Sequence, residues 1–120
     1  MQLFRSIMEY GSPVWNNLGI VLSNELERLQ KRAHRIIHGE CNCIFPSLTN
    51  RRNLLSLKIL LAAESDNQHP LHRIVPHRIS RNRLFNIEHA RTSRRQGSWM
   101  LRTCLYHNNK YHLSISNANN

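Results

Sequence analysis

Acidic residues, which metal-dependent nucleotidyl transfer requires, are scarce in this chain. The chain has 120 residues with seven Asp and Glu. Asp66 is the only aspartate, and Glu64 lies two positions before it. Two-metal nucleotidyl transfer needs several carboxylates that converge on ions ~3.5–4 Å apart. A lone Glu-x-Asp at a helix end instead favours a solvated charge pair, and no Gly-rich phosphate loop is present. We therefore expect no complete catalytic centre and no cofactor.

Four residues of the kinds that bind zinc fall close together in the sequence. His34 and His38 are spaced to share one side of a helix, and Cys41 and Cys43 follow within a few residues. Histidine and cysteine are the usual zinc ligands. However, Cys-x-Cys is not the usual spacing, and no second pair follows at a typical distance. We expect no metal and keep a small zinc-binding protein as the third alternative.

Nucleophilic catalysis has little support, and the cysteines indicate a reducing environment. The pairs Gly11-Ser12 and Gly97-Ser98 are typical of turns and lack the pattern that flanks a nucleophilic serine. Three cysteines do not form a disulfide framework. No signal peptide and no apolar run of ~20 residues is visible. We expect an intracellular protein, nuclear or cytoplasmic, that is not secreted and has no membrane partner.

Positive charge is the strongest signal in the sequence. Seventeen Lys and Arg give a formal net charge of +10, and such a chain attracts polyanions. Residues 24–38 predict a helix with one apolar stripe, formed by Leu22, Leu26, Leu29, Ala33 and Ile36. At ~100° per residue its basic residues centre roughly 140° from that stripe; they are Arg28, Lys31, Arg32 and Arg35. We expect the stripe to face a core and this basic face to contact an RNA or DNA backbone.

Other residues could extend this interface. Further phosphate contacts are predicted at Arg51, Arg52, Arg91, Arg94 and Arg95. Tyr10 and Trp15 could stack on bases, although such residues more often fill a small core beside a turn. A solvated helix face is the alternative interpretation of the basic residues.

The remaining patterns predict an all-α fold of three or four short, loosely packed helices. A short helix is expected over 2–10 and a loop over 14–22. Asn24 and Glu27 have capping-box spacing for the 24–38 helix, and Gly39 is placed to end it. Ser47 or Thr49 could cap a further helix that runs to about Ala63, with Leu54, Leu57 and Leu61 on one face.

Beyond that helix the prediction becomes less regular. The pattern breaks over 64–68, and a short turn or helix follows between His69 and Pro76. We expect an Arg-rich irregular segment over 77–96, one more short element over 98–106, and a frayed C-terminal tail over 114–120.

Several segments resemble one family. The resemblance rests on Ile7-Met8-Glu9-Tyr10-Gly11-Ser12-Pro13-Val14-Trp15, Leu26-Glu27-Arg28-Leu29-Gln30-Lys31-Arg32-Ala33, Arg35-Ile36-Ile37, Pro46-Ser47-Leu48 followed by Arg51-Arg52 and Leu57, His69-Pro70-Leu71-His72, and Arg91-Thr92-x-Arg94 before Ser98. In order and approximate gaps these resemble the C-terminal part of non-LTR (LINE-type) retrotransposon reverse transcriptases, over about residues 5–105.

The resemblance implies a thumb-like helical region over 1–63 and a basic post-thumb segment over 64–120. It implies helices that help to hold a template-primer duplex, while the chemistry of the parent RNA-directed DNA polymerase is done by a palm that this chain lacks. Gly97-Ser98-Trp99 departs from the family's aromatic-rich pattern. We therefore expect a non-catalytic fragment that binds RNA or DNA backbone, with a palm-containing polypeptide as a further partner. The alternatives are a helical protein-interaction module and a non-functional retroelement remnant.

Overall fold

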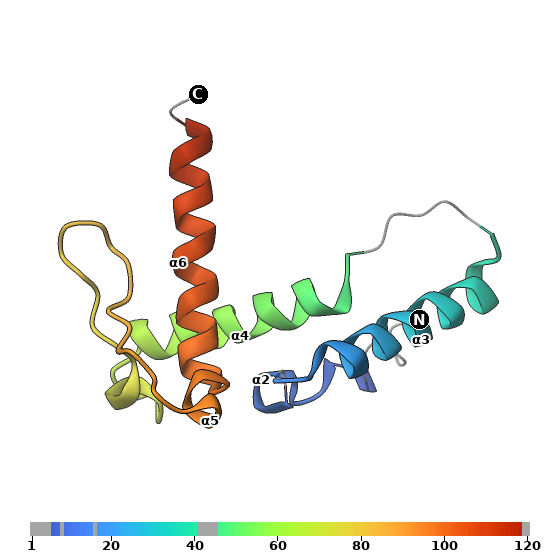
Figure 1. Ribbon diagram of the computed structural model, residues 1–120, viewed down its shortest axis with the longest axis horizontal. Helices are drawn as coiled ribbons and strands as arrows, with labels where there is room; N and C mark the ends of the chain where they lie inside the picture. Colours follow the sequence, from blue (N-terminus) through green and yellow to red (C-terminus); the bar gives the residue numbers. More distant parts are fainter. Residues whose placement is uncertain (1–5, 8, 16, 41–45, 119–120) are drawn as a thin grey trace. The chain divides into compact units, whose positions relative to one another are not determined.

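The chain is helical and divides into two compact units. The computed structural model describes residues 6–7, 9–15, 17–40 and 46–118. Its elements are α2 (Ser12–Trp15), α3 (Ile20–His38), α4 (Leu48–Ser65), the 3-10 helix η1 (His72–Ile74), α5 (Ser93–Gln96) and α6 (Trp99–Ala118) (Figure 1). Unit 1 spans Met1–Leu55 and unit 2 spans Ser56–Asn120, so their boundary falls inside α4. In the described part of the chain the only β-pairing is one isolated bridge, and the predicted all-α class is confirmed.

Unit 1 begins differently from the prediction. Of the helix expected over 2–10, residues 1–5 and 8 lie outside the described residues, while 6, 7 and 9 are helical. Gly11 turns the chain with a φ of +62°, a backbone conformation that glycine adopts without strain. Part of the segment expected to be a loop is helical, because α2 occupies Ser12–Trp15 and α3 starts at Ile20. Gly19 is the N-cap of α3 and provides no side-chain cap, so the capping box at Asn24 is wrong.

The packed side of α3 is polar, which the sequence pattern did not predict. Gln30 and His34 are its buried residues, and Ser23 and Glu27 are half-buried at helical spacing with them. The prediction that the apolar stripe faces a core is wrong for three of its five residues, because Leu22, Leu29 and Ile36 are 54%, 54% and 76% exposed. The physical reason lies in α4, whose first turns offer polar side chains to α3.

Hydrogen bonds join α3 to the start of α4. Glu27 Oε1 accepts from the backbone N–H of Thr49 at 3.0 Å. The hydroxyls of Ser23 and Thr49 lie 3.2 Å apart, and Arg52 Nη2 donates to both of them, at 3.1 and 3.2 Å. Ser47 Oγ accepts from the N–H of Asn50 at 3.2 Å, so the predicted Ser47 cap of α4 is confirmed. The N–H groups of a first helical turn have no partner within the helix. In α4, the N–H of Thr49 is satisfied by Glu27 of α3 and that of Asn50 by Ser47, which precedes α4.

Unit 2 has the apolar core of the chain. Leu57, Leu60, Phe85 and Cys104 are buried together, and Val75, Ile87, Trp99, Met100 and Tyr106 pack against them. The predicted apolar face of α4 is only partly right. Leu57 is buried, but Leu54 and Leu61 are exposed, and the buried positions continue to Leu60 and Ala63.

The Arg-rich segment predicted over 77–96 is largely irregular, but its last four residues form α5. Contacts at Phe85 fix the shape of its irregular part. Arg78 and Phe85 form an antiparallel bridge, with the N–H of Asn86 donating to the carbonyl of His77 at 2.9 Å. Asn108 of α6 then brackets Phe85: its Oδ1 accepts from the Phe85 N–H at 3.0 Å, and its Nδ2 donates to the Phe85 carbonyl at 3.1 Å. This holds the loop beside α6 (Figure 1).

The last helix is longer than expected. α6 runs from Trp99 to Ala118, so the frayed tail predicted from residue 114 is wrong as far as residue 118; residues 119–120 lie outside the described part. Serines of its last turns donate to carbonyls one turn earlier, Ser114 to Tyr111 at 2.7 Å and Ser116 to His112 at 3.0 Å. None of the helices in the described residues is both long and apolar enough to cross a membrane.

Candidate nucleic-acid interface

The basic face of α3 is formed as the sequence predicted. Its four residues Arg28, Lys31, Arg32 and Arg35 are all exposed. None of the ion pairs found among the described residues involves them. From Arg28 to Arg35 the helix rises about 10 Å, the rise of about three phosphates along one strand. Arg35 also lies in the last turn of α3, where the helix dipole favours a cation.

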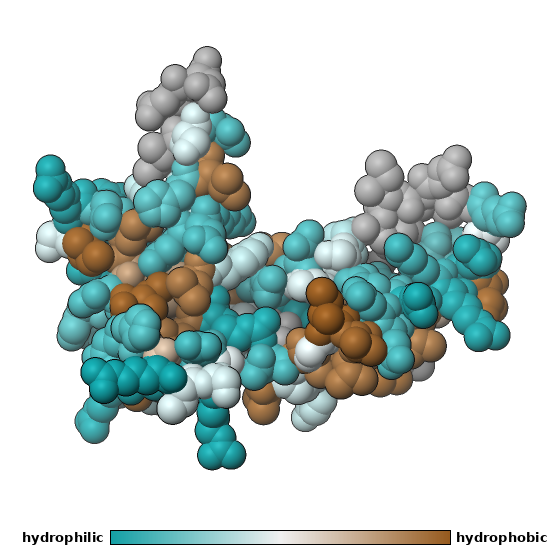
Figure 2. All heavy atoms as spheres, in the orientation of Figure 1, coloured by the Kyte–Doolittle hydropathy of each residue, from teal (hydrophilic) through white to brown (hydrophobic). Residues whose placement is uncertain are grey.

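The helix α3 therefore has three distinct faces: polar, apolar and basic. At ~100° per residue, the packed polar side centres roughly 110° from the apolar stripe and about 120° from the basic face. The hydrogen bonds to α4 come from Ser23 and Glu27 on the polar side. Figure 2 shows both apolar (brown) and hydrophilic (teal) side chains on the surface over α3. The four basic residues and three residues of the apolar stripe, Leu22, Leu29 and Ile36, are thus exposed.

Two predicted phosphate contacts are used within unit 1 instead. Arg52 is 1% exposed, and its guanidinium lies 5.2 Å from the centre of the Trp15 ring. Arg51 Nη2 lies 2.8 Å from Glu9 Oε1 in an ion pair whose side chains are 25% and 16% exposed. We remove both from the predicted interface, because a buried or paired guanidinium would first have to break these contacts.

The two predicted stacking residues differ in their surroundings. Trp15 is half-buried, donates its Nε1–H to the Tyr10 carbonyl at 2.7 Å, and already packs against Arg52. Tyr10 is 85% exposed. Trp15 therefore has a structural role in the turn that precedes α3, and of the two only the Tyr10 ring is freely accessible.

Unit 2 carries the other predicted basic residues. Arg91, Arg94 and Arg95 are exposed, around the start of α5, where Thr92 Oγ1 caps the helix by accepting from the Arg95 N–H at 3.3 Å. Arg95 Nη2 lies 2.8 Å from Glu88 Oε2, in a pair whose side chains are 61% and 78% exposed. Such an exposed pair contributes little and exchanges readily.

The carboxylates of Glu64 and Asp66 do not form a metal site together. Glu64 is held by Arg78 in a two-point ion pair, with Nη2–Oε2 at 2.6 Å. The hydrogen bond from Arg78 lowers the pKa of Glu64 and raises that of Arg78. Asp66 is exposed and accepts from the Gln68 N–H at 2.9 Å, as in a turn. Glu64 is therefore not the solvated charge that we expected.

The zinc prediction stays untested. The rings of His34 and His38 lie 4.7 Å apart, with His34 buried and His38 exposed. Cys41 and Cys43 lie outside the described residues. Among the residues that are described, no three His, Cys, Asp or Glu side chains gather closely enough to hold a metal ion.

Sequence reasoning missed one feature of unit 2, a pocket of about 480 Å³. Its lining comes from the end of η1 and the loop after it, the segment after Phe85, Arg95 of α5, and the start of α6. These segments share no motif, so no sequence signal could have found it. Cys104 lies at the pocket and is fully buried, and burial raises the pKa of its thiol to about 11. The thiol therefore remains neutral at physiological pH and serves as apolar lining.

Comparison with known proteins adds no family to this description. No protein-family model, curated protein or solved structure matches the chain.

Proposed function

We propose that this chain binds the phosphate backbone of RNA or DNA through the basic face of α3. It does so as a non-catalytic fragment that resembles the C-terminal part of a non-LTR retrotransposon RNA-directed DNA polymerase. The observation that carries the proposal is the exposure of Arg28, Lys31, Arg32 and Arg35 on one side of a single helix. Because cationic side chains on this face suit phosphate oxygens, binding depends on phosphate charge and shows little preference for sequence.

The energetics follow from counterion release. Each phosphate that a Lys or Arg neutralises releases condensed cations into solution, which favours binding at low salt. The formal net charge of +10 adds long-range attraction that speeds association. The long-range attraction depends on the total charge, whereas counterion release depends on which charges contact phosphates.

A pair of matched variants separates the two effects. The variant R28Q/K31Q/R32Q/R35Q removes the face, and K58Q/R73Q/R81Q/K110Q removes four exposed charges elsewhere. Both lower the formal charge from +10 to +6. In fluorescence anisotropy with a labelled single-stranded 20-mer at low salt, the first should weaken binding more than about tenfold and the second less than about threefold. Equal losses would mean that binding reflects total charge and not this face.

A protein-interaction module is the second candidate, and one observation favours it. Leu22, Leu29 and Ile36 form an exposed apolar stripe on α3, and exposed apolar patches commonly mark protein contacts. The partner that the resemblance implies is a palm-containing polypeptide. The variant L22Q/L29Q/I36Q should abolish capture of such a polypeptide while leaving oligonucleotide affinity within about twofold. No capture by the unmodified chain would end this candidate.

A further inference from the structure

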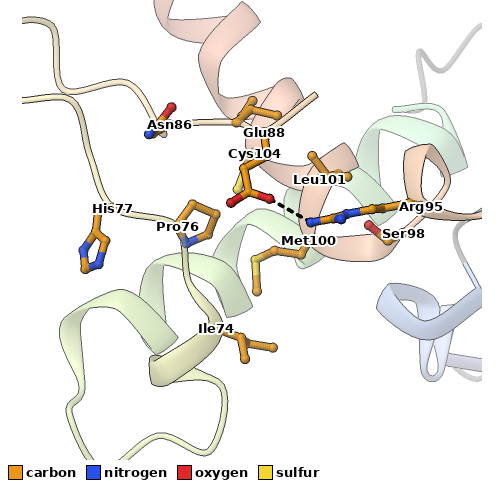
Figure 3. A pocket seen from close by; sticks show the side chains of 11 residues that line it. Ile74, Pro76, His77, Asn86, Glu88, Arg95, Ser98, Met100, Leu101 and Cys104 are labelled. Carbon is orange, nitrogen blue, oxygen red and sulfur yellow. Dashed lines mark hydrogen bonds and ion pairs between the residues drawn. The ribbon is translucent and has the colours of Figure 1, made fainter. Parts of the chain in front are cut away.

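The pocket of unit 2 has an apolar interior. Pro76, Ile87, Met100 and Leu101 are half-buried lining residues, and Cys104 is fully buried. The volume of about 480 Å³ lies in the range of roughly 300–1,000 Å³ of pockets that hold small ligands. Figure 3 shows Pro76, Glu88, Arg95 and Met100 grouped around the same space. A ligand with a flat apolar face would therefore cover these apolar lining residues and exclude water from them.

The polar lining residues have hydrogen-bonding capacity left for a ligand. Asn86 carries a side-chain amide that both donates and accepts, and it is exposed at the pocket. Glu88 contributes a carboxylate, which accepts only. Arg95 uses one Nη2–H for its pair with Glu88, out of the five N–H donors of a guanidinium. The pocket thus offers acceptors, an amide and a cation beside an apolar interior.

Neighbouring basic residues add to the positive charge of Arg95 beside the pocket. Arg91 and Arg94 lie close in sequence to Arg95 and are exposed, and His77 also lines the pocket. Guanidinium groups suit phosphate because their planar donors match its oxygens in pairs. The charge around this pocket therefore favours an anionic ligand over a cationic one.

We propose that this pocket holds one unpaired nucleotide, with its base against Pro76, Ile87 and Met100, the polar edge of the base at Asn86 and Glu88, and its phosphate at Arg95. A heteroaromatic base has the required flat faces and polar edge, as in pockets that receive extruded bases. The inference rests on the proposed function, because the nucleotide is taken to belong to a bound single strand. It adds a base-contacting site to a protein whose α3 contacts phosphates alone.

The carboxylate of Glu88 should make the pocket selective among bases. Glu88 accepts from N–H groups, and an exocyclic amino group of guanine, adenine or cytosine can reach it as a donor at the edge of the base. Uracil presents only its N3–H, between two carbonyl oxygens that a carboxylate repels. Guanine, adenine and cytosine monophosphates should therefore bind more tightly than uridine monophosphate. A charge-assisted contact of this kind corresponds to about a tenfold difference in affinity.

Met100 provides a direct probe of the pocket. The chain has three methionines, so methyl-labelled methionine gives few NMR signals, and M100L assigns the one at the pocket. Titration with GMP, AMP, CMP, UMP, guanosine and inorganic phosphate should shift the Met100 methyl signal saturably with the amino-bearing monophosphates. Absence of a shift up to about 10 mM GMP would overturn the proposal.

Two variants test the assigned contacts. R95Q should weaken GMP at least about tenfold and leave guanosine unchanged, because only the phosphate contact is lost. R81Q, which removes the charge of another exposed arginine, should change GMP binding less than about twofold. Equal affinity of GMP for R95Q and the unmodified chain would contradict the assignment.

The two proposals can fail separately. The variant R28Q/K31Q/R32Q/R35Q leaves the pocket intact and should bind GMP as the unmodified chain does. If oligonucleotides bind through α3 but no monophosphate shifts Met100, the pocket proposal falls alone. If GMP binds at Met100 but removing the α3 face does not weaken oligonucleotide binding, the proposed role of α3 falls while the pocket stands.

Discussion

Glu27 of α3 accepts the backbone N–H of Thr49 of α4 at 3.0 Å. Its spacing from Asn24 is that of a residue that caps its own helix, yet it caps the next one. The contact belongs to the first turn of α4, where N–H groups have no partner within the helix. A negative charge at that position also interacts favourably with the helix dipole. One polar side chain therefore ties together the two helices.

Replacing Glu27 should destabilise unit 1. The variant E27A leaves the Thr49 N–H without its acceptor and should cost about 1 kcal/mol of unfolding free energy, as the loss of an N-terminal cap does. Urea denaturation followed by Trp15 fluorescence in a W99F background measures this. The exposed Glu25 of the same helix is the control, and E25A should change the stability by less than about 0.5 kcal/mol. Similar costs for both variants would mean that the contact with Thr49 has no energetic role.

The ion pair of Glu64 and Arg78 should make the stability of unit 2 depend on pH. Arg78 holds the pKa of Glu64 below its usual value of 4.5. A carboxyl whose folded pKa is lowered stabilises the protein fully above the unfolded value, and this contribution is lost as the pH falls through the folded value. The Tm should therefore fall on acidification from about pH 5 to about pH 3, and E64Q should flatten that fall.

The control for this prediction is Glu88, whose pair with Arg95 is much more exposed. E88Q should leave the Tm–pH curve nearly unchanged, because solvent screens an exposed pair. A curve of E64Q that parallels the curve of the unmodified chain over this range would show that other groups set the acid response.

Leucines on α3 and α4 should differ in their importance for folding. Leu29 is 54% exposed and Leu60 is fully buried. L60A should cost about 2–5 kcal/mol, from lost burial and the cavity left behind. L29A should cost less than about 0.5 kcal/mol, since a surface substitution in a helix changes little. Thermal or urea unfolding checks both, and a large cost for L29A would indicate that the stripe is covered in the folded chain.

Local signals in the sequence predicted much of the fold. Gly39 ends α3 with a φ of +70°, and Ser47 caps α4. Both are decided by contacts within a few residues, which a sequence pattern expresses directly. The existence of α3 and α4 and most of the irregular Arg-rich segment followed from the same kind of signal.

The errors came from contacts between distant residues. Apolar spacing identified a stripe on α3, but pairing with Thr49 and Arg52 of α4 decides which face is packed, and that pairing is polar. In α6, the polar residues after 113 suggested fraying, yet the backbone is helical to Ala118, and the hydroxyls of Ser114 and Ser116 donate to carbonyls of the preceding turn. Neither outcome is encoded by hydropathy.

The predicted exposure of the basic side chains was right where it depended on one helix and wrong where it depended on packing. Arg28, Lys31, Arg32 and Arg35 share an exposed face because helical geometry alone places them together. Arg51 and Arg52 follow one another on α4, but their partners Glu9 and Trp15 come from a segment some forty residues earlier in the chain. Charge in the sequence does not reveal which guanidinium groups are already bound.

The salt dependence of oligonucleotide binding tests the central claim most directly. The slope of log Kd against log salt counts the phosphates that the protein neutralises, at about 0.7 per phosphate for single strands and about 0.9 for duplex DNA. Removing Arg28, Lys31, Arg32 and Arg35 should lower this slope by about 3, while K58Q/R73Q/R81Q/K110Q should leave it unchanged. The same slope for the unmodified chain and the α3 variant would show that these four residues do not contact the nucleic-acid backbone.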